Sequence, residues 1–177
     1  MKELKLNVIK GSIAALLTAA LGMSHTALAD TQLNITGTIK ASPCNVVNDT
    51  GSGISVNLGD NIQAATLGKA DTFTEWKPFQ LILEDCPTTT TSVTATFSGT
   101  PSDENADMYK NTGEAKKVQI DLQDATTSTV LGNGKPLQQT IVNNATTYNL
   151  KARAYSKDGG ATPGSIVGTV MVAFTYE

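Results

Sequence analysis

The sequence contains a single histidine, His25, and two cysteines, Cys44 and Cys86. Catalysis of the Ser-His-Asp or Cys-His type requires a histidine, and histidine is also the commonest ligand of zinc and haem. His25 lies in a segment that we expect to be removed on export, so the remaining chain would have no histidine. We therefore predict no catalytic residues, no metal site, no cofactor, and a structural or binding protein rather than an enzyme.

The carboxylates offer two further candidate sites. Asp103, Glu104 and Asp107 lie in one polar stretch, but this stretch lacks the spaced oxygen ligands and the glycine of an EF-hand loop. Glu84 and Asp85 are neighbours, so in a strand they point to opposite faces and form a poor acid/base pair. We interpret the first group as a solvated acidic loop rather than a calcium site.

Charged residues are also scarce, at 16%, and the net charge is −3. Lysine and arginine form no cluster, which argues against nucleic acid and against anionic membrane surfaces as partners. The longest apolar run, residues 13–21, is shorter than the about 20 residues that a membrane-spanning helix needs. We expect no membrane span.

This apolar run follows three lysines, Lys2, Lys5 and Lys10, and precedes the small-x-small sequence Ala27-Leu28-Ala29. The arrangement is typical of a secretory signal peptide, residues 1–29, with cleavage after Ala29 to within one residue. The chain is therefore expected to be exported.

The two cysteines of an exported chain are expected to form a disulfide, and two free buried thiols are the alternative. A disulfide between Cys44 and Cys86 would close a loop of about 43 residues and stabilise the fold by roughly 4 kcal/mol in the chain-entropy model.

No stretch of the chain shows a sustained helical period. Short stretches of alternating apolar and polar residues are instead separated by Gly, Pro, Asn and Asp turns, which predicts an all-β sandwich. Residues 61–72 are expected to form a loop with a short helical turn, and residues 100–114 a surface loop. The predicted strands cover residues 33–41, 54–58, 79–83, 93–97, 118–122, 137–142, 148–154 and 164–176.

The longest alternation, residues 164–176, lies at the C-terminal end of the chain. A long apolar strand in this position leaves a sheet edge that invites pairing with another chain unless something covers it. A second alternation precedes Cys44 and consists of Leu33, Ile35, Gly37, Ile39 and Ala41.

Several features occur together in this chain. It has a predicted signal peptide, one predicted disulfide and an alternating N-terminal tail with a central glycine. Its C-terminal strand has Gly164 as the fourteenth residue from the end and Tyr176 as the penultimate residue. In this combination the chain resembles the pilin subunits of the chaperone–usher pathway over its whole length after the signal peptide. It is most similar to the minor subunits of type 1 fimbriae, which act as adaptors in the tip fibrillum. The motifs that carry this closer resemblance are Ala29-Asp30, Pro43-Cys44, VNLGD at 56–60, VTATFSG at 93–99, YKN at 109–111 and GGAT at 159–162.

The resemblance implies an incomplete immunoglobulin-like β-sandwich that lacks its last strand and is completed by a donor strand from another subunit. It divides the chain into a signal peptide (1–29), an N-terminal donor-strand extension (30–43) and a pilin domain (44–177). The implied donor strand uses Leu33, Ile35, Gly37, Ile39 and Ala41. The implied acceptor groove, which is also the chaperone-binding strand, uses Gly164, Ile166, Gly168, Val170, Val172, Phe174, Tyr176 and Glu177.

The resemblance also implies the partners: a periplasmic pilus chaperone, an outer-membrane usher, and neighbouring fimbrial subunits on both sides. The protein would pass through the periplasm into a cell-surface fimbrium that supports adhesion. Gly37 is expected to lie where the neighbour's groove is shallow, although a strand glycine also marks bulges.

Three alternatives remain at this point. Instead of a minor adaptor subunit, the chain would be a major rod pilin, an adhesin that binds carbohydrate, or a secreted β-sandwich enzyme or monomeric binding module. The resemblance implies that an adhesin of this pathway would have two domains and no donor tail. The single domain with a patterned tail therefore argues against the adhesin alternative. The absent histidine and the uncovered terminal strands argue against the last alternative.

Overall fold

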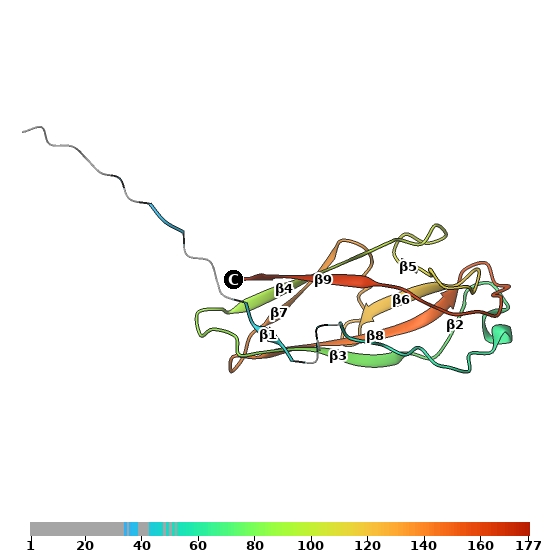
Figure 1. Cartoon of the computed structure of the whole chain (residues 1–177), viewed down its shortest axis with the longest axis horizontal. Coiled ribbons are helices and arrows are strands. Elements are labelled where there is room, and N and C mark those ends of the chain that lie inside the picture. Colours follow the sequence, from blue (N-terminus) through green and yellow to red (C-terminus); the bar gives the residue numbers. More distant parts are fainter. Residues whose placement is uncertain (1–33, 35, 39–42, 48, 50, 52) are drawn as a thin grey trace, which may run out of the picture. The chain divides into compact units, whose positions relative to one another are not determined.

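The computed structural model describes residues 34, 36–38, 43–47, 49, 51 and 53–177. The chain divides into two compact units, residues 1–38 and 39–177, and every element described below lies in the second unit. The predicted signal peptide falls outside the described residues. The second unit is built of strands with one short 3-10 helix, so the all-β prediction is confirmed (Figure 1).

The elements follow one another closely along the described part of the chain. They are β1 (Asn45–Val46), η1 (Ala64–Leu67), β2 (Thr72–Phe73), β3 (Lys77–Glu84), β4 (Ser92–Gly99), β5 (Tyr109–Lys110), β6 (Gln119–Asp124), β7 (Lys135–Thr140), β8 (Thr146–Ser156) and β9 (Val170–Tyr176).

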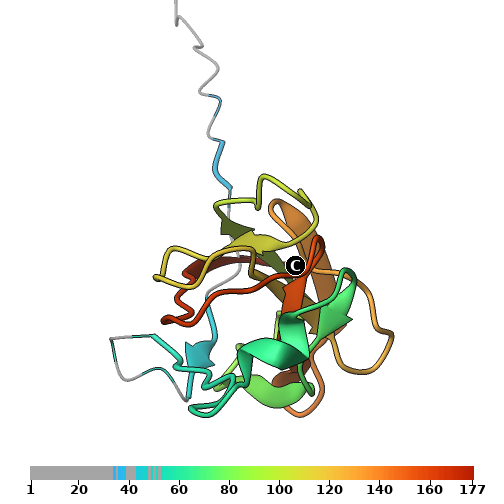
Figure 2. The same ribbon diagram turned by 90° about the vertical axis from the view of Figure 1, so that its right-hand side faces the viewer.

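The strands form two antiparallel sheets. The larger sheet has the order β1-β3-β8-β6-β5, with β2 also paired to β8, and the smaller sheet has the order β7-β4-β9. In Figure 1, β4 and β9 of the smaller sheet run above β3 and β8 of the larger one. Figure 2 looks along the strands from the end of the sandwich that carries η1.

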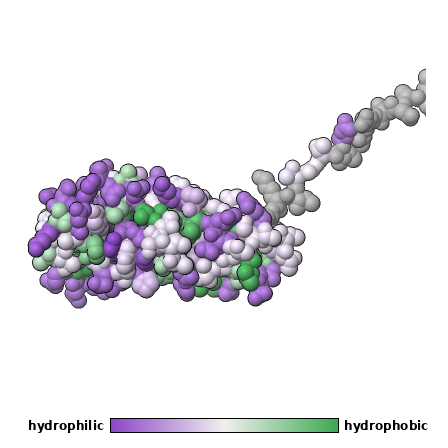
Figure 3. Space-filling model, turned by 180° about the vertical axis from the view of Figure 1, so that it is seen from behind, coloured by the Kyte–Doolittle hydropathy of each residue, from purple (hydrophilic) through white to green (hydrophobic). Residues whose placement is uncertain are grey.

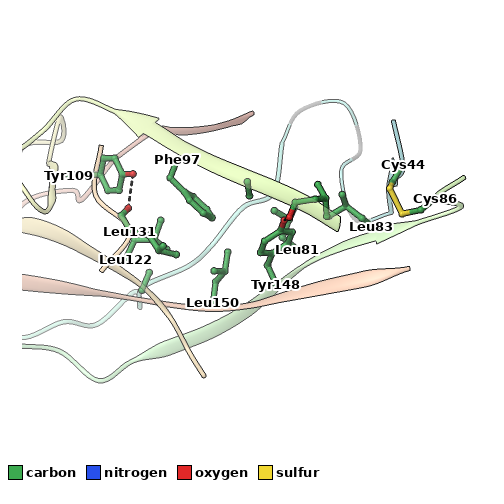
Figure 4. Close-up of a cluster of buried hydrophobic side chains, with 13 residues drawn as sticks. Cys44, Leu81, Leu83, Cys86, Phe97, Tyr109, Leu122, Leu131, Tyr148 and Leu150 are labelled. Atoms are coloured by element: carbon green, nitrogen blue, oxygen red, sulfur yellow. Dashed lines mark hydrogen bonds between the residues drawn. A yellow bond between two sulfur atoms is a disulfide. The ribbon is translucent and has the colours of Figure 1, made fainter. Parts of the chain in front are cut away.

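The core fills the space between these sheets because inward and outward side chains alternate along each strand. On β4, Val93, Ala95 and Phe97 point inward and are at most 1% exposed. On β8, Tyr148 and Leu150 are similarly buried, and Figure 4 shows Phe97, Tyr148 and Leu150 pointing into the space between the two sheets.

Two buried tyrosines in this core have hydrogen-bonded hydroxyls. Tyr109 Oη donates to the main-chain oxygen of Leu131 at 2.8 Å (Figure 4), and Tyr148 Oη donates to that of Val93 at 2.8 Å. Burial raises the pKa of Tyr109 to about 12. Both hydroxyls therefore stay neutral at physiological pH and tie loops and strands to the core.

The predicted disulfide is present. Cys44 and Cys86 are joined, with a separation of 42 residues along the chain (Figure 4). Cys44 immediately precedes β1 and Cys86 follows β3, and these two strands pair with Asn45 opposite Glu84. The disulfide therefore links the residue before the edge strand β1 to the chain just after β3, the neighbour of β1 in the larger sheet.

Three sequence predictions need correction. Residues 54–58 alternate as expected but form no strand, because no described segment pairs with them. The C-terminal strand starts at Val170 rather than Gly164, because residues 165–167 bond to the 111–115 loop instead of a strand. The two-residue strands β1, β2 and β5 were not predicted, since so short a pairing leaves no period in the sequence.

The remaining long strands lie within a few residues of their predicted positions, and the predicted helical turn is η1. Among the residues described, no helix is long and apolar enough to cross a membrane.

Candidate functional site

The C-terminal strand β9 is an edge strand. It pairs with β4, from Val93 opposite Tyr176 to Gly99 opposite Val170, and in the described part of the chain it has no second neighbour. The opposite edge of the same sheet is β7, which carries Lys135 and Pro136. Lysine and proline block strand pairing, whereas β9 carries neither, so the two edges differ in their ability to accept another strand.

Hydrogen bonds at the end of β9 show which residues face its free edge. Ser92 and Glu177 exchange two main-chain bonds, N to O at 3.1 Å and 3.0 Å, so they form a hydrogen-bonded pair. Such pairs alternate along an antiparallel ladder, so odd-numbered residues of β9 bond to β4. The main-chain N–H and C=O groups of the even-numbered residues therefore point away from β4.

The same alternation continues before β9. The main-chain oxygen of Ser165 accepts from the Ala115 amide at 3.1 Å, and that of Val167 accepts from the Thr112 amide at 2.8 Å. Odd-numbered residues are again the bonded ones. One continuous free edge thus runs over residues 164–176, and we call it the acceptor edge.

The even-numbered side chains along the acceptor edge point into the sandwich and remain half-buried. Val170, Val172, Phe174 and Tyr176 pack against the core cluster without being fully covered, unlike the inward residues of β4. The Phe174 ring lies 6.3 Å from the rings of both Tyr148 and Tyr176, measured between centroids. The core is therefore partly open to solvent beside the acceptor edge.

A second row of half-buried apolar side chains packs against the same core. Ile54, Val56 and Leu58 alternate with polar residues, and in the described part of the chain no strand pairs with them on either side, whereas β9 has β4 on one side. Two segments of the sandwich thus carry half-buried apolar side chains and unpaired main-chain groups beside the same core. This arrangement is expected where a strand of the sandwich is absent.

A hollow of about 340 Å³ lies at the residue-164 end of the acceptor edge. We call it the end pocket. Its apolar lining includes Ile62, Leu67, Ala115, Val118 and Ile166.

At the other end, the strand is tied to the start of the domain. The Thr91 amide donates to the main-chain oxygen of Glu177 at 2.6 Å. Burial raises the pKa of Tyr176, and a hydrogen bond with the main chain of Cys44 offsets part of that rise. The acceptor edge therefore ends beside Cys44, the residue that precedes β1.

The two predicted glycines of this site have structural reasons. Gly164 has a φ of +151°, and a Cβ there would lie 2.5 Å from the Ala115 nitrogen. At Gly168, a Cβ would lie 2.4 Å from Cδ1 of Ile120. Only glycine fits either position without a shift of its neighbours.

The predicted donor strand falls mostly outside the described residues, namely Leu33, Ile35, Ile39 and Ala41. Gly37 is described and exposed, and a Cβ there would have no heavy atom within 4 Å. Its role in binding a neighbouring subunit stays a prediction.

The acidic stretch has a structural role. Lys110 Nζ bonds Asp103 at 2.6 Å, and Glu104 accepts from Ser102 Oγ at 2.6 Å and from Gln119 Nε2 at 3.2 Å. The bond from Ser102 is the main cause that lowers the pKa of Glu104. These two carboxylates hold their loop in place.

Sequence reasoning missed a charged cluster on the outer face of the larger sheet. Arg153 Nε donates to Asp121 at 3.0 Å, and the guanidinium carbon lies 3.9 Å from the Phe73 ring centroid and 4.0 Å from that of Trp76. No pattern in the sequence marks this cluster, since its members are spread over 81 residues.

The face of the molecule seen in Figure 3 is mostly hydrophilic, with hydrophobic residues in small separate areas.

Comparisons with known proteins agree with this architecture. The family model described as "Fimbrial protein" matches residues 33–177. The chain is 32% identical to Protein FimG of Escherichia coli K12 over the full length of both. It is 37% identical to the S-fimbrial adhesin protein SfaS of Escherichia coli O6:K15:H31 (strain 536 / UPEC) over 148 residues, which cover 83% of this chain and 85% of SfaS.

Among solved structures, the P pilus rod subunit PapA matches with a TM-score of 0.62 at 17% identity. The match covers 77% of this chain and 100% of PapA. At this identity the likeness shows the fold alone: an immunoglobulin-like sandwich of the incomplete type found in pilus subunits.

Proposed function

Since the chain belongs to the fimbrial protein family and is a subunit of the chaperone–usher type, we propose that it is a minor, adaptor subunit of a fimbria. In this role its acceptor edge receives an extended donor strand from one neighbouring subunit. Its own N-terminal extension, residues 30–43, enters the corresponding groove of the neighbour on the other side.

The observation that carries the proposal is the unpaired acceptor edge over a half-open core. A strand added there gains main-chain hydrogen bonds along residues 164–176 and places alternate side chains against the core. Each aliphatic side chain that becomes buried contributes roughly 1.5–3 kcal/mol. Three such residues, as in Leu33, Ile35 and Ile39 of the extension, give about 5–9 kcal/mol before ordering costs.

The acceptor edge also accounts for the proposed partners. An uncovered apolar edge aggregates, so an exported subunit needs a periplasmic chaperone that covers it until a neighbour replaces the chaperone at an outer-membrane usher. The predicted signal peptide, residues 1–29, supplies the route to the periplasm. The place of action is the cell-surface fimbrium, where the subunit supports adhesion. In this role the chain carries no catalytic site.

The adaptor role is supported by the full-length similarity to FimG. The 37% identity with SfaS, which is named as an adhesin, favours a second candidate: a subunit that itself binds carbohydrate. A major rod subunit would occur in many copies along the fibre, and an adaptor in few copies near one end. Neither alternative changes the proposed use of the acceptor edge.

Expression of the exported chain with and without its chaperone tests the proposal. We expect soluble protein only with the chaperone, or when a copy of residues 30–43 is appended after Glu177 through a short linker. A stable, soluble monomer with neither would contradict it.

The position in the fimbria requires a second measurement. Purified fimbriae, cross-linked and analysed by quantitative mass spectrometry, give both neighbours and the copy number. Few copies with two different neighbours support the adaptor role, whereas many copies that contact one another support a rod subunit. Retention of a glycan by the purified subunit would support the adhesin candidate.

A further inference from the structure

We propose that the outer face of the larger sheet binds an acidic sugar, that is, a pyranose that carries a carboxylate. Arg153 and Lys151 bind the carboxylate, and the ring lies against Trp76. We call this surface the outer-face site. It lies on the sheet that does not contain the acceptor edge, so the inference does not rest on strand acceptance and adds a ligand-binding surface to the subunit.

The centre of the outer-face site is Arg153 on β8. Its Nε donates to the Asp121 carboxylate at 3.0 Å, and no other hydrogen-bond acceptor contacts the guanidinium among the residues that the structure describes. The side chain is 15% exposed, and the terminal nitrogens are not among the buried atoms that lack a partner, so they reach solvent. Two parallel N–H groups of a guanidinium match the two oxygens of a carboxylate. The terminal fork of Arg153 is thus available to a carboxylate from solvent.

The guanidinium is held in place before any ligand arrives. Its carbon lies 3.9 Å from the centroid of the Phe73 ring and 4.0 Å from that of Trp76, and Asp121 fixes its Nε. A side chain that is already ordered loses little conformational entropy on binding. Because the Asp121 side chain is fully buried beneath it, an approaching anion meets the cation first.

Lys151 supplies a second cation on the same face. It precedes Arg153 by two residues on β8, so both side chains point outward. Its Nζ lies 4.8 Å from the centroid of the Trp76 ring and donates to Ser128 Oγ, a neutral partner, at 2.8 Å. The buried Asp124 accepts from the amide and hydroxyl of Thr127 and forms no ion pair with Lys151 in the described chain. The charge of Lys151 is therefore also available to an anion.

A hollow of about 410 Å³ adjoins these cations, a volume in the range of about 300–1,000 Å³ that is typical of small-molecule sites. Pro78, Gln80 and Asn149 contribute to its lining, and Pro78 lies opposite Lys151 in the pairing of β3 with β8. Gln80 Nε2 donates to Asn149 Oδ1 at 2.9 Å. Carboxamides both donate and accept hydrogen bonds, which suits the hydroxyl groups of a sugar.

The aromatic rings distinguish a sugar from a simple anion. Phe73 is 52% exposed, and Trp76 is partly exposed. The apolar face of a pyranose packs on an aromatic side chain while its hydroxyl groups bind polar partners, whereas a small inorganic anion has no apolar face. Two cations, exposed rings and a pair of carboxamides on one face therefore match a ligand that has a carboxylate, an apolar face and hydroxyl groups.

The test uses two matched pairs of probes. Glucuronic acid is compared with glucose, which lacks the carboxylate, and N-acetylneuraminic acid, whose carboxylate has another ring position, with its uncharged methyl ester. The protein is the soluble chain, with residues 30–43 appended after Glu177 where solubility requires it. Trp76 is the only tryptophan of the chain, so its fluorescence reports on the outer-face site. Titration calorimetry at constant ionic strength gives the affinities independently.

We expect at least one acid to change the Trp76 emission in a saturable way and to bind about 10–100-fold more tightly than its uncharged counterpart. This factor corresponds to the loss of charge-assisted hydrogen bonds. Arg153→Lys, which keeps the charge but removes the fork, and Lys151→Gln should each weaken binding about tenfold. Lys135→Gln removes the same charge from β7 in the other sheet and should leave the affinity unchanged. Lys151→Gln keeps the test open if Arg153→Lys fails to fold.

Three results would overturn the inference. Absence of saturable binding of both acids to the unchanged chain refutes the site and leaves the proposed function standing. Equal affinity for the two members of each pair refutes the role of the cations. An equal loss of affinity in Lys151→Gln and Lys135→Gln shows attraction by overall charge rather than a defined site.

Discussion

The ion pair on the outer face of the larger sheet gives a prediction about the stability of the domain. The side chain of Asp121 is fully buried and that of Arg153 is 15% exposed, and the guanidinium carbon lies within 4.0 Å of the centroids of both the Phe73 and the Trp76 ring. Arg153→Met keeps an unbranched side chain but leaves the Asp121 carboxylate without its cation. Removing one partner of a buried pair costs about 3–5 kcal/mol.

Two further contacts adjust this figure in opposite directions. Loss of the cation–π contacts adds roughly 0.5–1 kcal/mol for each ring. Gln123 Nε2 still donates to both oxygens of Asp121, at 3.1 Å and 3.3 Å, and retains part of the hydrogen bonding. We therefore expect Arg153→Met to lower the free energy of unfolding by about 4 kcal/mol.

The assay is guanidinium denaturation of the chain with the appended donor segment, because that form is expected to be a stable monomer. Arg153→Lys keeps the charge but loses the planar fork and the stacking, so it should cost about 1–2 kcal/mol. The double variant Asp121→Leu with Arg153→Met removes both charges and should recover most of the stability. A loss below about 1 kcal/mol for Arg153→Met, or a double variant as unstable as the sum of both singles, would refute the reasoning.

Three further predictions concern the acceptor edge and its supports. Val172→Lys places a charge where the incoming strand closes the core, so this variant should no longer be stabilised by the appended segment. Met171→Lys lies on the exposed face and should still be stabilised by it. Thermal unfolding of each variant with and without the appended segment tests both expectations. Replacing Cys44 and Cys86 by Ser should cost about 4 kcal/mol in chemical denaturation, and a loss near zero would contradict the loop-closure argument. Gly164→Ala should cost about 1–3 kcal/mol in the same assay because of its left-handed backbone, and a neutral result would show that the neighbouring loop gives way easily.

The sequence predicted the long strands because their inward residues are apolar and their outward residues polar, as on β4 and β8. It predicted the disulfide from export and an even cysteine count. It failed at residues 54–58, where the alternation is that of a strand but the partner is missing. Periodicity reports which face is buried, and does not report whether a hydrogen-bonding neighbour exists.

The acceptor edge was predicted only in part. The half-buried row along β9 follows from its period, and Gly164 and Gly168 were expected from the family resemblance. Ile120 and the end pocket were not, because they reach the edge from other strands and loops. Such contacts depend on tertiary packing and have no local pattern in the sequence. The use of residues 30–43 as a donor remains a prediction.

The difference between the two edges of the smaller sheet has a consequence for the material that such subunits form. Lys135 and Pro136 disfavour pairing at the β7 edge, so the smaller sheet is expected to accept a strand at the β9 edge alone. With one extension per chain, each subunit under the proposed function has two unlike connection points. Units of this kind polymerise into unbranched filaments whose two ends differ chemically, and they do not cross-link into networks.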